Sequence, residues 1–203
     1  MINSFLKLGT YFLHPIWLST YAIIFYFSYS GFLYTYENMI AKVFAIIILT
    51  VILPILFLIL LKPLKIISSF HLHSIKERRI PLLFFTSITA FILNFIFDPT
   101  EYRVPFYFFS GVFFSGMTCI ILSFVNYKIS LHALGISSLA TFVIAFSVLY
   151  QIEVLLFISI SIFCTGWVIS SRLLLKSHNL NELISGVLLG IGSQLIFIQF
   201  WYT

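Results

Sequence analysis

Hydrophobic positions run along this chain in long stretches that short polar connectors separate. A transmembrane helix needs about 20 mainly apolar residues. The stretches have roughly that length and lack the ten-residue alternation of a membrane β-barrel strand. They therefore predict an all-α fold, a polytopic membrane bundle of six to seven transmembrane helices. The candidate spans are residues 16–34, 41–61, 81–97, 105–125, 132–150, 153–170 and 183–202.

Three prolines fall at positions that the predicted spans can accommodate. Pro54 lies inside the second span, where neighbouring helices can satisfy the carbonyl that it leaves unpaired. Pro81 and Pro105 each open a span, and proline suits the first position of a helix. Residues 1–13 are expected to form an interfacial segment ahead of the first span.

Composition excludes a soluble protein. Apolar residues make up 61% of the 203 residues and charged residues 8%, whereas a soluble domain has about 25% charged residues. In a membrane protein the net charge of +5 indicates how the loops are oriented and that anionic ligands can bind; it does not indicate nucleic-acid binding. Membrane lipids are the expected surroundings. Cys119 and Cys164 lie inside apolar runs, where we expect them to pack as small side chains without a disulfide.

The polar residues concentrate in three connectors, residues 62–80, 126–132 and 171–182. Two predicted spans separate the first connector from the second, and two more separate the second from the third. With seven helices, all three connectors are expected on the same side of the membrane. A site shared by the three connectors is therefore possible.

The most informative connector reads Ser171-Arg172-Leu-Leu-Leu-Lys-Ser-His178-Asn-Leu-Asn-Glu182. Glu182 follows His178 by four residues, a spacing that places both on one face of a helix. A carboxylate there can hold one ring nitrogen and leave the other free as a nucleophile. Arg172 offers a planar fork of donors that suits phosphate. The plainer interpretation of these residues is a solvated loop that anchors the helix.

A second string, Lys128-Ile-Ser130-Leu-His132, stands at the start of a span. Ser130 and the free backbone N–H groups of a helix N-terminus can bind an anion. His132 can act as a general acid toward a leaving oxygen. The plainer interpretation is a single histidine near a helix cap.

A third group of cations, Lys76, Arg78 and Arg79, comes just before the span that Pro81 opens. These side chains can hold phosphate oxygens. They can equally serve as a topological signal, because positive residues accumulate on the cytoplasmic side of membrane proteins.

Together the strings resemble the type-2 phosphatidic acid phosphatase superfamily, the membrane lipid phosphate phosphatases. That family carries K-x6-R-P, P-S-G-H and S-R-x5-H-x3-D in this order. Ser171, Arg172 and His178 match the third motif at the same offsets, with Glu182 in place of the aspartate. The small-residue string that starts at Ser185 also resembles the helix that follows this motif. The resemblance covers residues 76–190.

The other two motifs diverge. Ser130 and His132 match the second motif, but Ile129 and Leu131 replace its proline and glycine. In the first motif, Ile80 separates Arg79 from Pro81, and Leu72 stands at the position of the lysine. Leu131 crowds the loop where phosphate would meet backbone N–H groups, and Glu182 is one methylene longer than aspartate. A weakened site, an altered substrate and a non-catalytic relative are all compatible with these changes.

The resemblance implies a role for each matched residue. His178 would attack phosphorus and form a phosphohistidine, which Glu182 would orient and stabilise. His132 would protonate the leaving group and then activate water. No cofactor or metal is implied. The lipid phosphate would be held by Arg172, Ser130, Arg79, Lys76 and Arg78.

Other classes fit less well. Intramembrane prenyltransferases need aspartate-rich metal sites, and Asp98 is the one aspartate of this chain. The H-E-x-x-H motif of zinc metalloproteases is absent from the sequence. A non-catalytic, phosphatase-like membrane protein that binds or transports anionic lipids stays open as the alternative. It would keep the cations without needing His178 and Glu182 together.

The remaining polar residues are interpreted as structural. His71 and His73 are two residues apart and face opposite ways on a helix, so we expect ordinary loop residues. Lys62 and Lys65 are expected to extend toward lipid head groups. A short loop on the opposite side of the membrane contains Asp98, Glu101 and Arg103.

The positive residues favour a cytoplasmic position for the three connectors, yet members of the family that the chain resembles usually act on the outer, periplasmic or lumenal face. Both orientations stay open. An Ile- and Phe-rich, Ala-poor composition is typical of bacteria with low-GC genomes, so we expect a bacterial inner (cytoplasmic) membrane. We treat residues 1–203 as one integral-membrane domain, with first spans in 1–75 and the phosphatase-like core in 76–203. No pattern predicts an oligomeric state.

Overall fold

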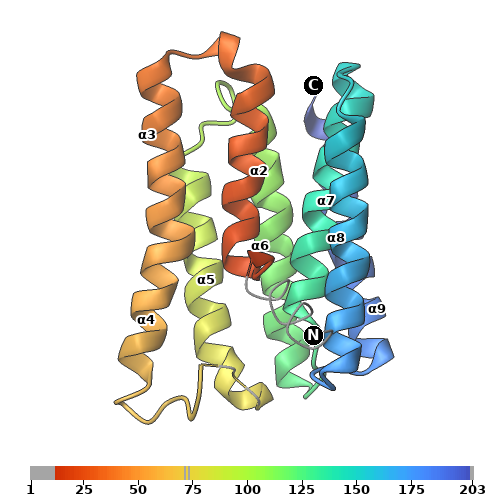
Figure 1. Cartoon of the computed structure of the whole chain (residues 1–203). Helices are drawn as coiled ribbons and strands as arrows, with labels where there is room; N and C mark the ends of the chain where they lie inside the picture. The colour runs from red at the N-terminus through yellow and green to blue at the C-terminus, as the bar shows by residue number, and fades with distance from the viewer. Residues whose placement is uncertain (1–11, 71, 73, 202–203) are drawn as a thin grey trace. The chain divides into compact units, whose positions relative to one another are not determined.

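The computed structural model describes residues 12–70, 72 and 74–201. These residues form helices, turns and connectors without a β-strand, which confirms the all-α class. The α-helices are α2 (Pro15–Ser30), α3 (Tyr36–Ile47), α4 (Leu53–Leu61), α5 (Ile75–Phe95), α6 (Arg103–Phe124), α7 (Leu131–Tyr150), α8 (Leu155–Leu174) and α9 (Leu180–Ile198) (Figure 1).

Six helical segments of the described chain are long and apolar enough to cross a membrane. The first predicted span falls short, because α2 has 16 residues, a rise of about 24 Å against a hydrocarbon core of about 30 Å. The chain is thus an integral, multi-pass membrane protein. The six segments are Tyr36–Leu61, Ile75–Phe95, Arg103–Phe124, Leu131–Tyr150, Leu155–Leu174 and Leu180–Trp201.

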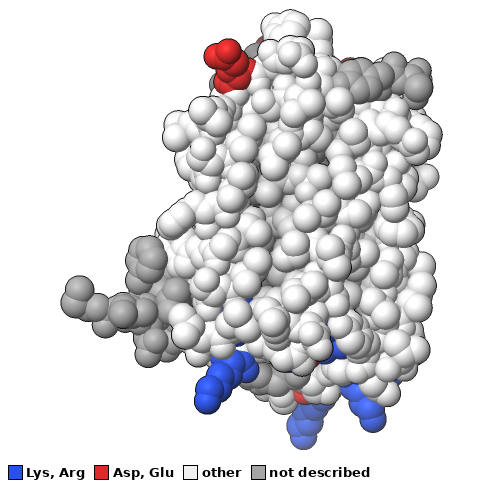
Figure 2. Space-filling view, turned by 90° about the vertical axis from the view of Figure 1, so that its right-hand side faces the viewer, with Lys and Arg blue, Asp and Glu red and all other residues white. Residues whose placement is uncertain are grey.

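Figure 2 looks onto the side of the molecule that carries α8 and α9. The middle of this side is uncharged, and lysine and arginine side chains gather at one end of it. Large apolar side chains of both helices, such as Leu156, Phe163 and Leu188, are exposed. Such a surface suits lipid, since acyl chains solvate apolar side chains as well as a protein interior does.

The prediction that Pro81 opens a helix is wrong. Helix α5 begins at Ile75, and Ser74 caps it by accepting a hydrogen bond from the Lys76 N–H at 3.3 Å. Its first two turns are mainly polar, so the apolar run is shorter than the helix and does not show where the helix begins. Arg79 and its neighbouring cations therefore lie on α5 and not in a connector before it. Pro105, by contrast, lies in the first turn of α6.

The prediction that Pro54 lies within a span is confirmed. The helix continues from Tyr36 to Leu61 through a π-helical turn, Ile48–Ile52, which ends two residues before Pro54. The Leu53 N–H bonds to the carbonyl of Ile48, five residues back. A wider turn next to a residue that has no N–H keeps the chain helical where a regular α-helix would lose a hydrogen bond.

The chain divides into two compact units. The first comprises the chain up to Ala22 and from Ile129 onward, and the second comprises Ile23–Lys128. In the first unit, α7 packs against both α8 and α9 (Figure 1). In the second unit, α5 packs against α4 and α6. The division into residues 1–75 and 76–203 was based on the extent of the phosphatase-like motifs, and it stays a prediction.

Two glycines let α9 approach α7 closely in the first unit. A Cβ on Gly186 would lie 2.7 Å from the carbonyl oxygen of Ser130, and one on Gly190 would lie 2.1 Å from the Ser137 hydroxyl oxygen. Ser138 donates a hydrogen bond of 3.2 Å to the Gly190 carbonyl. Small residues of this kind bring membrane helices into backbone contact. The packing places the first turn of α9 beside the N-terminus of α7.

Candidate functional site

His178 and Glu182 form a buried pair at the start of α9. The Nδ1 atom of His178 lies 2.5 Å from Oε2 of Glu182, and the side chains are 2% and 17% exposed. Asn179 is the N-cap of α9 and accepts a hydrogen bond from the Glu182 N–H at 2.9 Å. Its Nδ2 also donates to Oε1 of Glu182 at 3.3 Å. Both carboxylate oxygens are therefore held.

The expectation that His178 and Glu182 share a helical face needs one correction. His178 precedes the N-cap and is not part of α9. The pair forms because the chain turns at Asn179 and brings the imidazole back over the first helical turn. Asn179 stabilises the start of α9, because its side chain accepts a hydrogen bond from a backbone N–H that has no partner within the helix.

The turn between α8 and α9 fixes the spacing of Arg172 and His178. The Ser177 N–H bonds to the Arg172 carbonyl at 3.1 Å, and the Lys176 N–H bonds to the Leu173 carbonyl at 3.0 Å. Lys176 adopts the left-handed conformation, with φ of 50°. This is the hydrogen-bond pattern of a Schellman motif. Arg172 therefore lies in the last turn of α8, and His178 directly precedes the N-cap of α9.

Arg172 contacts His132, which lies 40 residues away in the sequence. A guanidinium nitrogen of Arg172 is 3.0 Å from Nδ1 of His132. Guanidinium nitrogens only donate, so Nδ1 of His132 accepts this bond. A neutral His132 ring consequently carries its proton on Nε2. The His132 side chain is buried in the first turn of α7.

Ser130 joins the two histidine-bearing segments. It is the N-cap of α7, where its hydroxyl accepts a hydrogen bond from the Ala133 N–H at 3.4 Å. Its own N–H donates to the Glu182 carbonyl at 3.2 Å. Ser130 is fully buried, and its role in phosphate binding stays a prediction. The contact with Glu182 places the His178 pair and the His132 pair at the same end of the first unit.

The structure adds His14, which sequence reasoning missed. Its ring meets that of His132 edge to face, with centroids 4.9 Å apart and an interplanar angle of 84°. Burial and the nearby Arg172 guanidinium lower the pKa of His14 to about 4. His14 belongs to none of the motifs and lies far from them in sequence. The one available signal is an ionisable residue at the very start of an apolar run.

The predicted cations of α5 belong to the second unit and have partners there. Arg79 donates to the carbonyl of Ser123 at 2.8 Å and lies over the Phe124 ring, 4.7 Å from its centroid. Arg78 donates through Nε to the carbonyl of Leu72 at 2.8 Å. These bonds hold the first turns of α5 to their surroundings. Lys76 has an exposed side chain, and phosphate binding by Lys76, Arg78 and Arg79 stays a prediction.

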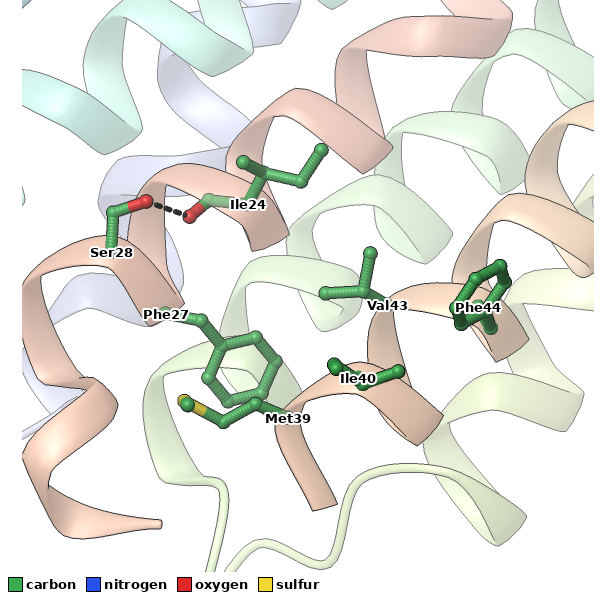
Figure 3. Close-up of a pocket in the computed structure, with 7 residues that line it drawn as sticks. All are labelled: Ile24, Phe27, Ser28, Met39, Ile40, Val43 and Phe44. Carbon is green, nitrogen blue, oxygen red and sulfur yellow. Dashed lines mark hydrogen bonds between the residues drawn. The ribbon is translucent and has the colours of Figure 1, made fainter. Parts of the chain in front are cut away.

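Two further candidates do not extend this site. His71 and His73 lie outside the described residues. A surface groove of about 290 Å³ runs between α2 and α3 in the second unit (Figure 3). Its lining carries no charge, so it offers nothing that would hold a phosphate. The lining residues are Ile24, Phe27, Ser28, Met39, Ile40, Val43 and Phe44.

Within the described residues, no group of three or more histidine, cysteine, aspartate or glutamate side chains is placed to hold a metal ion. Comparison of the chain with protein-family models, with curated proteins and with solved structures finds no match.

Proposed function

We propose that this protein is a membrane lipid phosphatase that hydrolyses a lipid phosphomonoester or diphosphate through a phosphohistidine at His178. The observation that carries the proposal is the 2.5 Å contact between Nδ1 of His178 and the Glu182 carboxylate. The carboxylate bonds to Nδ1 and favours the proton on that nitrogen. Nε2 therefore keeps the lone pair that a nucleophile needs. A carboxylate held at both oxygens also stabilises the positive charge that the ring gains when it is phosphorylated.

In the first step, Nε2 of His178 attacks phosphorus and the bond between phosphorus and the leaving oxygen breaks. The leaving oxygen takes a proton from the His132 imidazolium and departs as the lipid alcohol, or as the lipid monophosphate when the substrate is a diphosphate. Arg172 binds the non-bridging oxygens, over which charge spreads in the transition state.

In the second step, water attacks the phosphohistidine. His132, now neutral, accepts a proton from this water, the bond between phosphorus and Nε2 breaks, and inorganic phosphate leaves. His178 returns to its neutral form with its proton held toward Glu182. The two steps together consume one water and release one alcohol (or monophosphate) and one phosphate.

The contact between Arg172 and His132 describes the substrate-free state in this scheme. While Arg172 donates to Nδ1, that nitrogen cannot also carry a proton, and His132 cannot act as an imidazolium acid. A phosphate that draws the guanidinium away would free Nδ1 for protonation. Binding of the substrate would thereby prepare its own general acid.

The membrane setting supports a lipid as the substrate class. The site lies at one end of helices whose flanks are apolar, so the alkyl chains can stay among lipids while the head group reaches the histidines. Phosphatidic acid, phosphatidylglycerol phosphate, polyprenyl diphosphate and lipid A phosphates are candidates. A bacterial inner membrane remains our expectation for the location.

Phosphate release from these four lipids by the purified protein in detergent micelles tests the proposal. We expect turnover by the wild type and its loss in His178→Ala, by a factor of roughly 10³ or more, since removal of a nucleophile acts on this scale. Asn181→Ala is the matched control, because Asn181 is an exposed neighbour on the first turn of α9. An acid-labile phosphoenzyme should form in the wild type and not in His178→Ala.

Equal phosphate release by wild type and His178→Ala would exclude the phosphohistidine. Binding of anionic lipid vesicles by a wild type that never releases phosphate would instead favour the alternative, a non-catalytic lipid-binding or lipid-transporting protein.

A further inference from the structure

We infer that His14 is a positioning residue for His132, a role that rests on the proposed function of His132 as the general acid. The relevant observation is that two side chains hold the His132 ring from different elements. Arg172, from the last turn of α8, occupies its Nδ1 atom at 3.0 Å. His14, directly before α2, meets the ring at 84° with a centroid distance of 4.9 Å.

A perpendicular contact restricts the motion that a single hydrogen bond leaves open. The bond from Arg172 fixes one atom of His132, but the ring can still rock about the line of that bond. A second ring against it limits this rocking, because aromatic rings in edge-to-face contact have a preferred geometry. The orientation of Nε2, the atom that would transfer the proton, is therefore set by both neighbours.

His14 is itself anchored to the helices that it would help to organise. Its Nδ1 accepts a hydrogen bond from the Ile16 N–H at 3.4 Å. One turn later, Leu18 packs against Ile136 of α7 and Val168 of α8 in a buried cluster. The start of α2 therefore cannot shift away from α7 without breaking apolar contacts.

The charge state of His14 suits this position. The charged or titratable side chains next to it are Arg172 from α8 and His132 from α7. A protonated His14 would repel both the guanidinium and the imidazolium that the reaction requires. Its lowered pKa, about 4, keeps the ring neutral at neutral pH. His14 can therefore contact the His132 ring without placing a positive charge beside it.

Three variants of His14 distinguish the contribution of the aromatic ring from that of its nitrogen atoms. His14→Phe keeps an aromatic ring, His14→Gln keeps polar atoms without a ring, and His14→Ala removes both. The readout that does not depend on turnover is the pair of ¹⁵N signals of the His132 ring in histidine-labelled protein, assigned with His132→Gln. We expect one tautomer, with the proton on Nε2, in the wild type and in His14→Phe. In His14→Ala and His14→Gln we expect the same tautomer, because Arg172 still donates to Nδ1, but shifted and broader signals, because the ring is no longer held in one orientation.

In the phosphatase assay, His14→Ala and His14→Gln should lose kcat by roughly tenfold with little change in KM, as expected for a misplaced reacting group. The pH profile of kcat should change shape in these variants and be restored in His14→Phe.

Unchanged ¹⁵N signals of His132 in His14→Ala and His14→Gln would overturn the inference. So would a His14→Phe variant whose signals match those of His14→Ala, because the ring would then not be the cause. A wild type without phosphatase activity would end the proposed function, whereas the ¹⁵N comparison would still decide whether His14 positions His132.

Discussion

Nδ1 of His178 lies 2.5 Å from Oε2 of Glu182 although His178 stands outside the helix that carries Glu182. Asn179, the residue after His178, is the N-cap of α9, and its side chain also donates a hydrogen bond to the Glu182 carboxylate. A helix cap thus also forms the pair. The geometry makes both the length and the charge of residue 182 important.

Changing residue 182 should affect catalysis more than stability. Glu182→Gln keeps the size of the side chain but removes the negative charge that stabilises the His178 ring, so we expect kcat to fall by about 10²–10⁴. Glu182→Asp keeps the charge but shortens the side chain by one methylene, and we expect a smaller loss, on the order of tenfold. The measurement is initial-rate phosphate release, with Asn181→Ala as the control. Wild-type rates in Glu182→Gln would contradict the assigned role.

The low pKa of His14 should make the protein less stable in mild acid. An unfolded chain binds a proton at His14 below its ordinary pKa of about 6.5, whereas the folded chain does so only below about 4. Stability contributed by the neutral ring is therefore lost as pH falls from about 6.5 to about 4, and the loss levels off below that range. Because the ring is only partly buried, we expect an effect of about 1–2 kcal/mol.

Thermal unfolding in detergent at several pH values measures this effect. His14→Phe cannot bind the proton in either state, so its melting temperature should decline less than that of the wild type between pH 6.5 and pH 4. Parallel declines in the two proteins would show that His14 does not titrate as expected.

Close packing of α9 on α7 should make Gly190 intolerant of a side chain. A Cβ there would lie 2.4 Å from the carbonyl oxygen of Leu134, a backbone atom that cannot move alone. We expect Gly190→Ala to destabilise the protein by about 1–3 kcal/mol through overpacking. Phosphate release should also fall, because α9 carries Glu182.

Gly192→Ala is the matched control, since a Cβ at Gly192 meets nothing within 4 Å. Alanine favours a helix over glycine by about 1 kcal/mol, so this variant should be neutral or slightly more stable by thermal unfolding. A Gly190→Ala variant as stable as Gly192→Ala would argue against close helix packing.

The two ends of the spans can be assigned by labelling. Three spans, α6, α7 and α8, separate Thr100 from Ser177, so the two positions should lie on opposite sides of the membrane. Cys119 and Cys164 are first replaced, and single cysteines are then introduced as Thr100→Cys or Ser177→Cys. One of the two should react with a membrane-impermeant maleimide in intact cells, and the other only after permeabilisation. Labelling of Ser177→Cys only after permeabilisation would place the site in the cytoplasm, as the positive residues favour. Labelling of both in intact cells would contradict the span count.

Sequence alone was sufficient for features that depend on local residues. Long apolar runs predict membrane helices because transfer into lipid depends on the residues of the run itself. The proximity of His178 and Glu182 was also predictable from their i, i+4 spacing, although His178 precedes the N-cap of α9 and meets Glu182 through the turn at Asn179. Helix ends were less accessible: α5 begins at Ile75 rather than Pro81, because a cap at Ser74 allows a polar first turn that hydropathy does not detect.

Tertiary structure decided which distant side chains meet. Arg172 reaches His132 across 40 residues, and His14 meets His132 from an element that carries no motif. Such contacts depend on how each helix is rotated and how closely it approaches its neighbours. In the first unit, the glycines at positions 186 and 190 set the approach of α9 to α7. The sequence by itself determined a helical membrane protein with one local histidine–carboxylate pair, whereas packing alone decided that Arg172, His132 and His14 lie together, because no local spacing encodes the relative placement of separate helices.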